Sequence, residues 1–128
     1  MVAEAITNYL ASLGGYDTDS QVFMDHRPAE PIKCLVVHEY AGDPPSPFDV
    51  LQSNSFQVTV RDANIEVAKA SSYVLYNALL PTNTDCKVAV PGLELCQIYL
   101  RGTPLRLEDD ANGNAVYGFS IGVTSNIK

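Results

Sequence analysis

Apolar and polar side chains alternate at every position of the segment 56–61, FQVTVR. This is the period of a strand with one buried face. Beyond it the apolar positions recur every three or four residues, the period of a helix lying on a core. One row contains Ile65, Ala68, Ser72, Leu75 and Leu79. The pattern therefore predicts a strand that leads directly into a helix over 65–80, with Asp62 or Asn64 as its N-cap.

The opposite side of this predicted helix is also poor in charge. It contains Val67, Ala70, Tyr73, Val74, Tyr76 and Ala78. Lys69 is the only charged residue of the helix after Glu66. Since a helix that is apolar nearly all round is normally covered all round, we expect one face to pack on the sheet and part of the other to meet a second copy. An ordinary core helix with small residues on its wet side is the alternative.

The remaining pattern predicts a second helix and several more strands. The helix covers 2–13 and ends at Gly14 and Gly15. The strands are 21–24, 32–40, 86–90, 93–101 and 115–123, with an extended segment at 103–107 and loops at 41–49 and 81–85. The apolar run 34–37 predicts that strand 32–40 lies in the sheet interior. These elements predict an α+β fold, a single mixed and mostly antiparallel sheet flanked by two helices, with residues 1–128 as one domain.

Two details concern the C-terminal third. Asn112 and Gly113 form a two-residue hairpin signal before the last strand. That strand alternates bulky side chains (117, 119, 121, 123) with small ones (118, 120, 122). We expect the small side to be the place where a helix backbone approaches the sheet closely.

Composition narrows the function. The chain has 15 acidic and 8 basic residues and a formal charge of -7, so general binding to nucleic acid is not expected. It has no apolar run long enough for a membrane span, and its N-terminus lacks the basic cluster of a signal peptide. Cys34, Cys86 and Cys96 follow no CxxC spacing, which favours free thiols in a reducing compartment.

No motif of metal or nucleophilic chemistry is complete. Asp110 begins a calcium-like loop, but Ala115 stands where such a loop needs glycine. Cys34 and His38, four apart on a strand, are about 13 Å from one another, too far to share a zinc ion. We therefore expect no metal and no cofactor. A small hydrolase that uses His38 with Asp43 or Asp49 remains as the enzymatic alternative.

One polar side chain, Arg61, and one apolar side chain, Phe48, are candidates for contacts with a partner. Arg61 ends the alternating strand on its polar side. There it either pairs with a local carboxylate such as Asp62 or Glu66, or reaches an acidic group of a neighbouring copy. Phe48 is an aromatic residue in the proline-rich loop AGDPPSPFD, and its position there favours contact with another molecule.

Four segments together resemble one known family. They are the helix closing on LGG, the strand IKCLVVHEY with the loop AGDPPSPFD, the strand FQVTVRD running into a helix that ends in YNAL, and the ending RGTPLRLEDDANGNAVYGFSIGV. The chain is similar in these features to the small minor capsid and tail-terminator proteins of long-tailed bacteriophages. The resemblance covers nearly the whole chain and depends on the pattern and order of elements.

The resemblance implies a structural virion protein without enzymatic activity or cofactor. Such a protein forms a ring, as a hexamer, at the head-proximal end of the tail tube. It stops tube growth and contacts the tail-tube protein on one side and the head-completion or connector protein on the other, while DNA passes through the lumen. It is made in the host cytoplasm and ends in the virion. Another neck or minor capsid component, or an adaptor domain that binds a peptide along a sheet edge, are alternatives.

A cyclic ring needs two different surfaces on each subunit, which meet head to tail. The candidates are the outer side of the predicted helix 65–80, around Tyr73 and Tyr76, against the loop near Phe48 or the strand around Arg61. The acidic turn with Asp109 and Asp110 is expected to face either the lumen or the tail tube.

Overall fold

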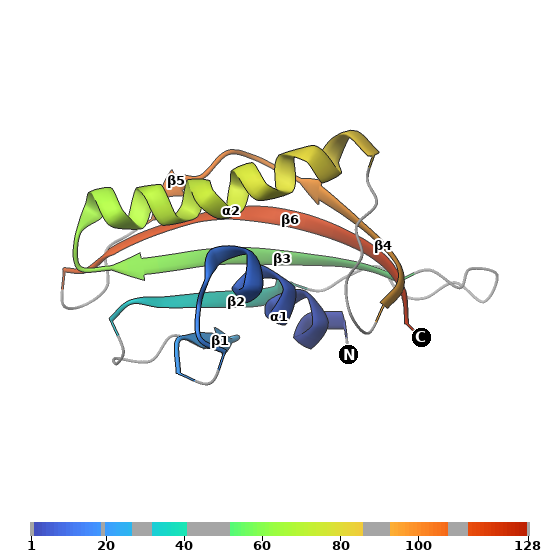
Figure 1. Ribbon diagram of the computed structural model, residues 1–128, viewed down its shortest axis with the longest axis horizontal. Coiled ribbons are helices and arrows are strands. Elements are labelled where there is room, and N and C mark those ends of the chain that lie inside the picture. The colour runs from blue at the N-terminus through green and yellow to red at the C-terminus, as the bar shows by residue number, and fades with distance from the viewer. Residues whose placement is uncertain are drawn as a thin grey trace.

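The computed structural model describes residues 2–18, 20–26, 32–40, 52–85, 93–107 and 113–127. In this part of the chain there are two helices and six strands, arranged around one sheet (Figure 1). The elements are α1 Val2–Gly14, β1 Val22–Met24, β2 Cys34–Tyr40, β3 Gln52–Asp62, α2 Ile65–Asp85, β4 Leu93–Leu100, β5 Leu105–Arg106 and β6 Ala115–Ile127. The predicted strand 86–90 lies outside the described residues.

The strands form a single sheet in the order β1-β2-β3-β6-β4, with β5 paired to β6. β1 runs parallel to β2, and the other pairings are antiparallel. The longest pairing joins β3 and β6 over eleven residues, from Gln52 opposite Ser125 to Asp62 opposite Ala115. The prediction of an α+β fold with a mixed, mostly antiparallel sheet is confirmed, and β2 lies in the sheet interior as predicted.

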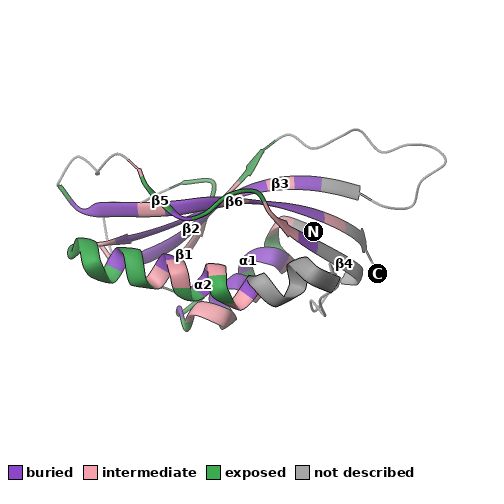
Figure 2. Ribbon diagram, turned by 90° about the horizontal axis from the view of Figure 1, so that it is seen from above, coloured by how far each residue is buried: buried purple, intermediate pink, exposed green. Residues whose placement is uncertain are grey.

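Both helices cover the same face of the sheet (Figure 2). Ile6 and Leu10 of α1 and Leu75 and Leu79 of α2 are fully buried there. They share one core with side chains of the sheet, among them Leu35, Val37, Phe56, Val58, Val60, Phe119, Ile121 and Val123. The apolar residues of the alternating segment 56–61, which predicted β3, point into this core. The opposite face of the sheet carries neither of the two described helices.

The junction between β3 and α2 is fixed by two short side chains. The Oδ1 atom of Asn64 accepts hydrogen bonds from the backbone N–H groups of Glu66 at 2.8 Å and Val67 at 3.4 Å. Asp62 accepts one from the backbone of Asn64 at 3.0 Å. Asn64 is therefore the N-cap, and it satisfies amide groups that the first helical turn leaves without internal partners.

The structure corrects two features predicted for this helix. α2 extends to Asp85, so the predicted loop 81–85 is helical. Pro81 removes one helical N–H, but packing of the preceding turns on the core supplies most of a helix's stability. Ile65, placed in the buried row from its spacing, is 39% exposed. It is the first residue of α2, and the buried row begins one turn later, at Ala68.

The segment before the last strand pairs with that strand, whereas Asn112 of the predicted two-residue turn lies outside the described residues. β5 pairs antiparallel with β6, with Leu105 opposite Gly118. The backbone N–H of Leu107 donates to the carbonyl of Val116 at 2.8 Å. Gly113 has a φ of 77°, the left-handed region that tight hairpin connections use. The final strand runs to Ile127, four residues beyond its predicted end.

The small side of β6 does not face a helix, so that prediction is wrong. The bulky side faces α2, where the rings of Phe119 and Tyr76 meet edge to face with centroids 5.8 Å apart. A Cβ built on Gly118 would lie 2.8 Å from the carbonyl oxygen of Val58 and 3.3 Å from a methyl group of Leu107. The small residues of β6 thus leave space on the face without helices. The backbone of the neighbouring strand and the β5 segment occupy this space.

Candidate subunit interface

The outer surface of α2 is exposed and largely apolar. We use this name for the residues at 66, 67, 70, 73, 74 and 77, which point away from the buried row. Val67 is 42% exposed and Val74 is 53% exposed, and Ala70 is also exposed. Three- and four-residue spacing places these side chains on one stripe. Branched aliphatic side chains gain free energy when they leave water, so the stripe is suited to a contact with another protein surface.

Tyr73 and Tyr76, the two tyrosines proposed for this interface, occupy different positions. Tyr76 is half-buried, contacts Phe119 of β6 and packs against the core. It lies four residues after buried Ser72 and three before buried Leu79, so helical geometry directs it toward the sheet. Tyr73 is half-buried beside it, with ring centroids 6.1 Å apart. Of the two tyrosines, only Tyr73 belongs to the outer surface of α2.

Arg61 is not a surface residue. It is 4% exposed, and its Nε atom donates a 2.9 Å hydrogen bond to the carbonyl oxygen of Ile32. Both interpretations of Arg61 expected a surface position, and this burial differs from it; a pairing with a local carboxylate or with a neighbouring copy stays a prediction. Its backbone lies between Cys34 of β2 and Val116 of β6, so the guanidinium stabilises the chain that leads into β2. Phe48, Asp109 and Asp110 lie outside the described residues, and their proposed contacts stay predictions.

A second exposed surface lies on the face of the sheet away from the helices. The strand register places Tyr40, Ser55, Gly122 and Tyr99 in one row across β2, β3, β6 and β4. Tyr40 is 49% exposed. Tyr99 is half-buried, and its hydroxyl lies 3.0 Å from the hydroxyl of Thr124. We call the row Tyr40, Ser55, Gly122 and Tyr99, together with Arg101, the bare-face patch.

Arg101 is the charged member of the bare-face patch. A Cβ built on Gly122 would lie 2.7 Å from its Nη2 atom and 2.8 Å from its Nε atom. The guanidinium therefore lies directly over the glycine, in space that a larger residue would fill. Its Nη1 atom donates to the hydroxyl of Ser55 at 3.0 Å. Arg101 is exposed, and the hydrogen bond to Ser55 fixes the position of its guanidinium.

The sequence pattern does not predict this patch. Its one signal is the small residue at 122 in the last strand, where the pattern predicts space for a helix. The space is taken instead by a side chain from the end of β4, because Tyr99 pairs with Gly122 and Arg101 follows two residues later on the same face. Without the strand order, nothing in the sequence relates positions 40, 55, 99 and 122.

The alternative sites of the sequence analysis find little support. His38 lies half-buried on β2 opposite Gln57, while Asp43 and Asp49 lie outside the described residues. Cys34 is buried and forms no disulfide. Across the described ranges, no group of three histidine, cysteine or acidic residues is arranged to hold a metal ion. No helix in these ranges is long and apolar enough to cross a membrane.

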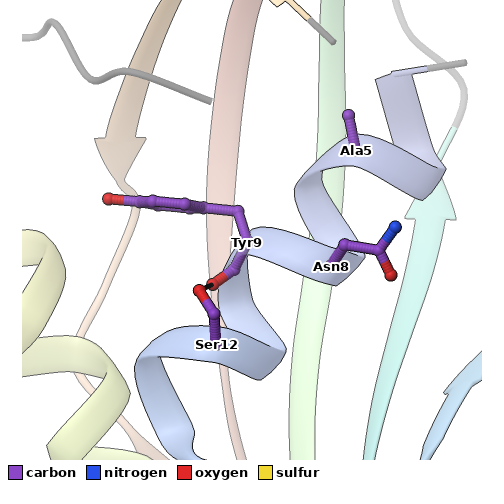
Figure 3. A pocket seen from close by; sticks show the side chains of 4 residues that line it. All are labelled: Ala5, Asn8, Tyr9 and Ser12. Carbon is purple, nitrogen blue, oxygen red and sulfur yellow. Dashed lines mark hydrogen bonds between the residues drawn. The ribbon is translucent and has the colours of Figure 1, made fainter. Parts of the chain in front are cut away.

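A hollow of about 190 Å³ lies beside α1, lined by Ala5, Asn8, Tyr9 and Ser12 (Figure 3). It is smaller than ordinary ligand pockets. The hydroxyl of Ser12 donates to the carbonyl of Tyr9 at 2.7 Å within the same helix. The side chains of Asn8 and Tyr9 point in different directions (Figure 3). These four residues supply no acid, base or activated nucleophile, so the hollow is not organised as an active site.

In the described part of the chain, a single mixed sheet has two helices on one face and leaves two exposed surfaces, which defines an α+β fold. The profile of the family described as bacteriophage tail terminator protein matches residues 9–127. The chain therefore belongs to the bacteriophage tail terminator family, and it is a structural component of a phage. The resemblance stated from the sequence is confirmed.

A solved structure superposes on this chain with a TM-score of 0.51 at 13% sequence identity. The alignment covers 99% of this chain and 92% of that chain. At this identity the likeness establishes only the fold, which is shared over the full length. No curated protein matches the sequence.

Proposed function

We propose that this protein is the terminator of a phage tail tube, acting as a closed ring of identical subunits. The ring, a hexamer, sits at the head-proximal end of the tube, stops its growth and provides the surface to which the head connector docks. Its partners are other copies of itself, the tail-tube protein and the connector or head-completion protein. In this role it needs no cofactor and carries out no catalysis.

The family match over residues 9–127 is the observation that carries this proposal. The exposed outer surface of α2 supports the ring. Val67 and Val74 are 42% and 53% exposed on a helix whose other side is fully buried at Ala68, Leu75 and Leu79. Association of this stripe with another subunit would remove its apolar area from water, the main favourable term in most protein association.

The net charge of -7 suits a position around a DNA passage. A ring that DNA must cross should not bind phosphate, because each neutralised phosphate adds to the affinity for the backbone. An acidic subunit repels DNA along the lumen, so the DNA passes without specific binding. In the proposed role, this position around the DNA passage is the head–tail junction of the virion.

The experiment that tests this role is tube assembly in vitro. Tail-tube protein of the same phage is polymerised alone and with increasing amounts of the purified terminator, and tube lengths are measured by electron microscopy. We expect the added protein to shorten the tubes and to be visible as a ring at one end. An unchanged length distribution, with no protein at the tube ends, would contradict the proposal.

A related outcome separates the terminator from another neck component. A protein that binds only the connector would leave tube length unchanged but would co-sediment with connector rings. A terminator arrests growth without any connector present. Heat-denatured protein at the same concentration is the control for nonspecific effects on polymerisation.

A further inference from the structure

The outer surface of α2 needs a binding partner in the proposed ring, and the inference about this partner rests on that ring. We infer that this surface docks onto the bare-face patch of the next copy, with Glu66 of one subunit paired to Arg101 of its neighbour. The occupant of each surface is thus a second copy of this chain. The contact is a helix laid on a sheet, the same layer arrangement that each subunit already uses internally.

The positions of the two surfaces favour this arrangement. α2 covers one face of the sheet, and the bare-face patch belongs to the other face (Figure 2). The two surfaces are therefore on opposite sides of the subunit. A two-fold dimer would use one of them against itself and leave the second exposed. A head-to-tail contact uses both, and it closes into a ring when each copy is rotated relative to the last.

The dimensions of the two surfaces also agree. Tyr40 and Tyr99 are three strand spacings apart across β2, β3, β6 and β4, a width of about 14 Å. Val67 and Val74 are seven helical residues apart, a rise of about 10 Å. A helix crossing the strands can therefore place both valines between the two tyrosines.

Charge supplies the third argument. Within the described part of the chain, the hydrogen-bond partner of the Arg101 guanidinium is the Ser55 hydroxyl, a neutral group. Among the described residues, this hydrogen bond holds the guanidinium in place without a carboxylate partner. The outer surface of α2 carries one carboxylate, Glu66, at its N-terminal end. Arginine often binds a carboxylate through two parallel hydrogen bonds. Both arginine and tyrosine are enriched at protein interfaces relative to the rest of the surface.

A charge exchange tests the pairing. We compare Arg101→Glu, Glu66→Arg and the double variant with the wild type by sedimentation, over a range of protein concentrations. Each single change should raise the dissociation constant of the assembly roughly thirtyfold or more, because it places like charges together. The double variant should regain most of the lost affinity. Arg106→Glu makes the same charge change at an exposed residue of β5 and should leave assembly unchanged.

Circular dichroism of each variant at low concentration verifies that the monomer is folded. Three results would overturn the inference. The single variants could assemble like the wild type, or the double variant could assemble as weakly as the single variants. The wild type could also stay monomeric at all concentrations. The same variants are then added to polymerising tail tubes. If the wild type and Arg101→Glu both arrest growth, the proposed function holds and this interface is wrong. If the wild type fails to arrest growth, the proposed function itself fails.

Discussion

The guanidinium of Arg101 lies over the backbone of Gly122, at a distance that leaves no room for a Cβ atom. One residue comes from the end of β4 and the other from the middle of β6. Because the glycine has no side chain, the arginine can lie flat on the sheet and donate to Ser55 of the next strand. This relationship gives the sheet face that carries no described helix a fixed positive charge.

The first prediction concerns this glycine. In Gly122→Ala the new methyl group would meet Nη2 and Nε of Arg101 at 2.7 and 2.8 Å. These atoms are the far end of a flexible side chain, so the arginine can move away. We expect the free energy of unfolding to change by less than about 1 kcal/mol, while the affinity of the assembly falls. Urea denaturation and sedimentation measure the two quantities separately.

Gly118→Ala is the matched control, four residues earlier on the same face of β6. Here the methyl group would meet the backbone carbonyl oxygen of Val58 at 2.8 Å and the methyl group of Thr59 at 2.9 Å. Strand backbone cannot move aside as a side chain can. We expect a loss of about 1–3 kcal/mol in the free energy of unfolding. Equal effects of the two alanines on stability would show that Arg101 does not occupy the described position.

The second prediction separates the two sides of α2. Val74 is 53% exposed, whereas Leu75 beside it is fully buried. Val74→Glu should leave the thermal unfolding of the monomer nearly unchanged and reduce assembly. Leu75→Ala should lower the free energy of unfolding by about 2–5 kcal/mol, because it leaves a cavity in the core. If Val74→Glu leaves the assembled mass unaltered, the outer surface of α2 is not an interface.

The third prediction concerns Arg61, which the structure places in a supporting position. Arg61→Ala removes the hydrogen bond to the Ile32 carbonyl and the packing of a buried side chain. We expect a loss of about 1–3 kcal/mol in the free energy of unfolding. At concentrations where the variant is fully folded, its affinity for other copies should equal that of the wild type. A variant of normal stability that fails to assemble would restore Arg61 as an interface residue.

The fourth prediction concerns Tyr16, which packs beneath α2. Burial raises the pKa of its hydroxyl above the ordinary value of 10.0, while a hydrogen bond with Ser71 acts in the opposite direction. The amino group of Lys33 lies 5.9 Å from the centre of its ring. Because the folded protein holds the proton more tightly than the unfolded chain, the contribution of Tyr16 to stability is complete below pH 10. It is lost as the pH rises further.

Tyr16→Phe should therefore make the free energy of unfolding less dependent on pH above 10, as measured by urea denaturation at a series of pH values. Below pH 10 the variant loses its hydrogen bond with Ser71, at a cost of about 1 kcal/mol. Tyr40→Phe is the control, because it removes an exposed hydroxyl. Identical pH profiles for the wild type and Tyr16→Phe would contradict burial of this group.

Much of the fold could be predicted because local pattern and tertiary contact agree. The alternation at 56–61 and the helical spacing at 68–79 both follow the one core beneath the helices. The errors arise where a distant contact decides. The predicted helix stops at residue 80, whereas α2 continues to Asp85 and packs Leu75 and Leu79 on the sheet.

The candidate site was harder to predict for the same reason. The sequence indicated an unusually apolar helix, and Val67 and Val74 are exposed as this required. It could not assign Tyr76 to the core, because that follows from contact with Phe119 on another element. It also could not bring Tyr40, Tyr99 and Arg101 together, since their proximity depends on the strand order.

The central claim is that each subunit uses two opposite surfaces to join copies into a closed ring. Native mass spectrometry of the purified protein tests it most directly. The account predicts one discrete species with a mass near six times that of the 13.9 kDa chain, and no open series of larger assemblies. A protein that is a monomer or a simple dimer at every concentration, also when bound at the end of a tail tube, would contradict it.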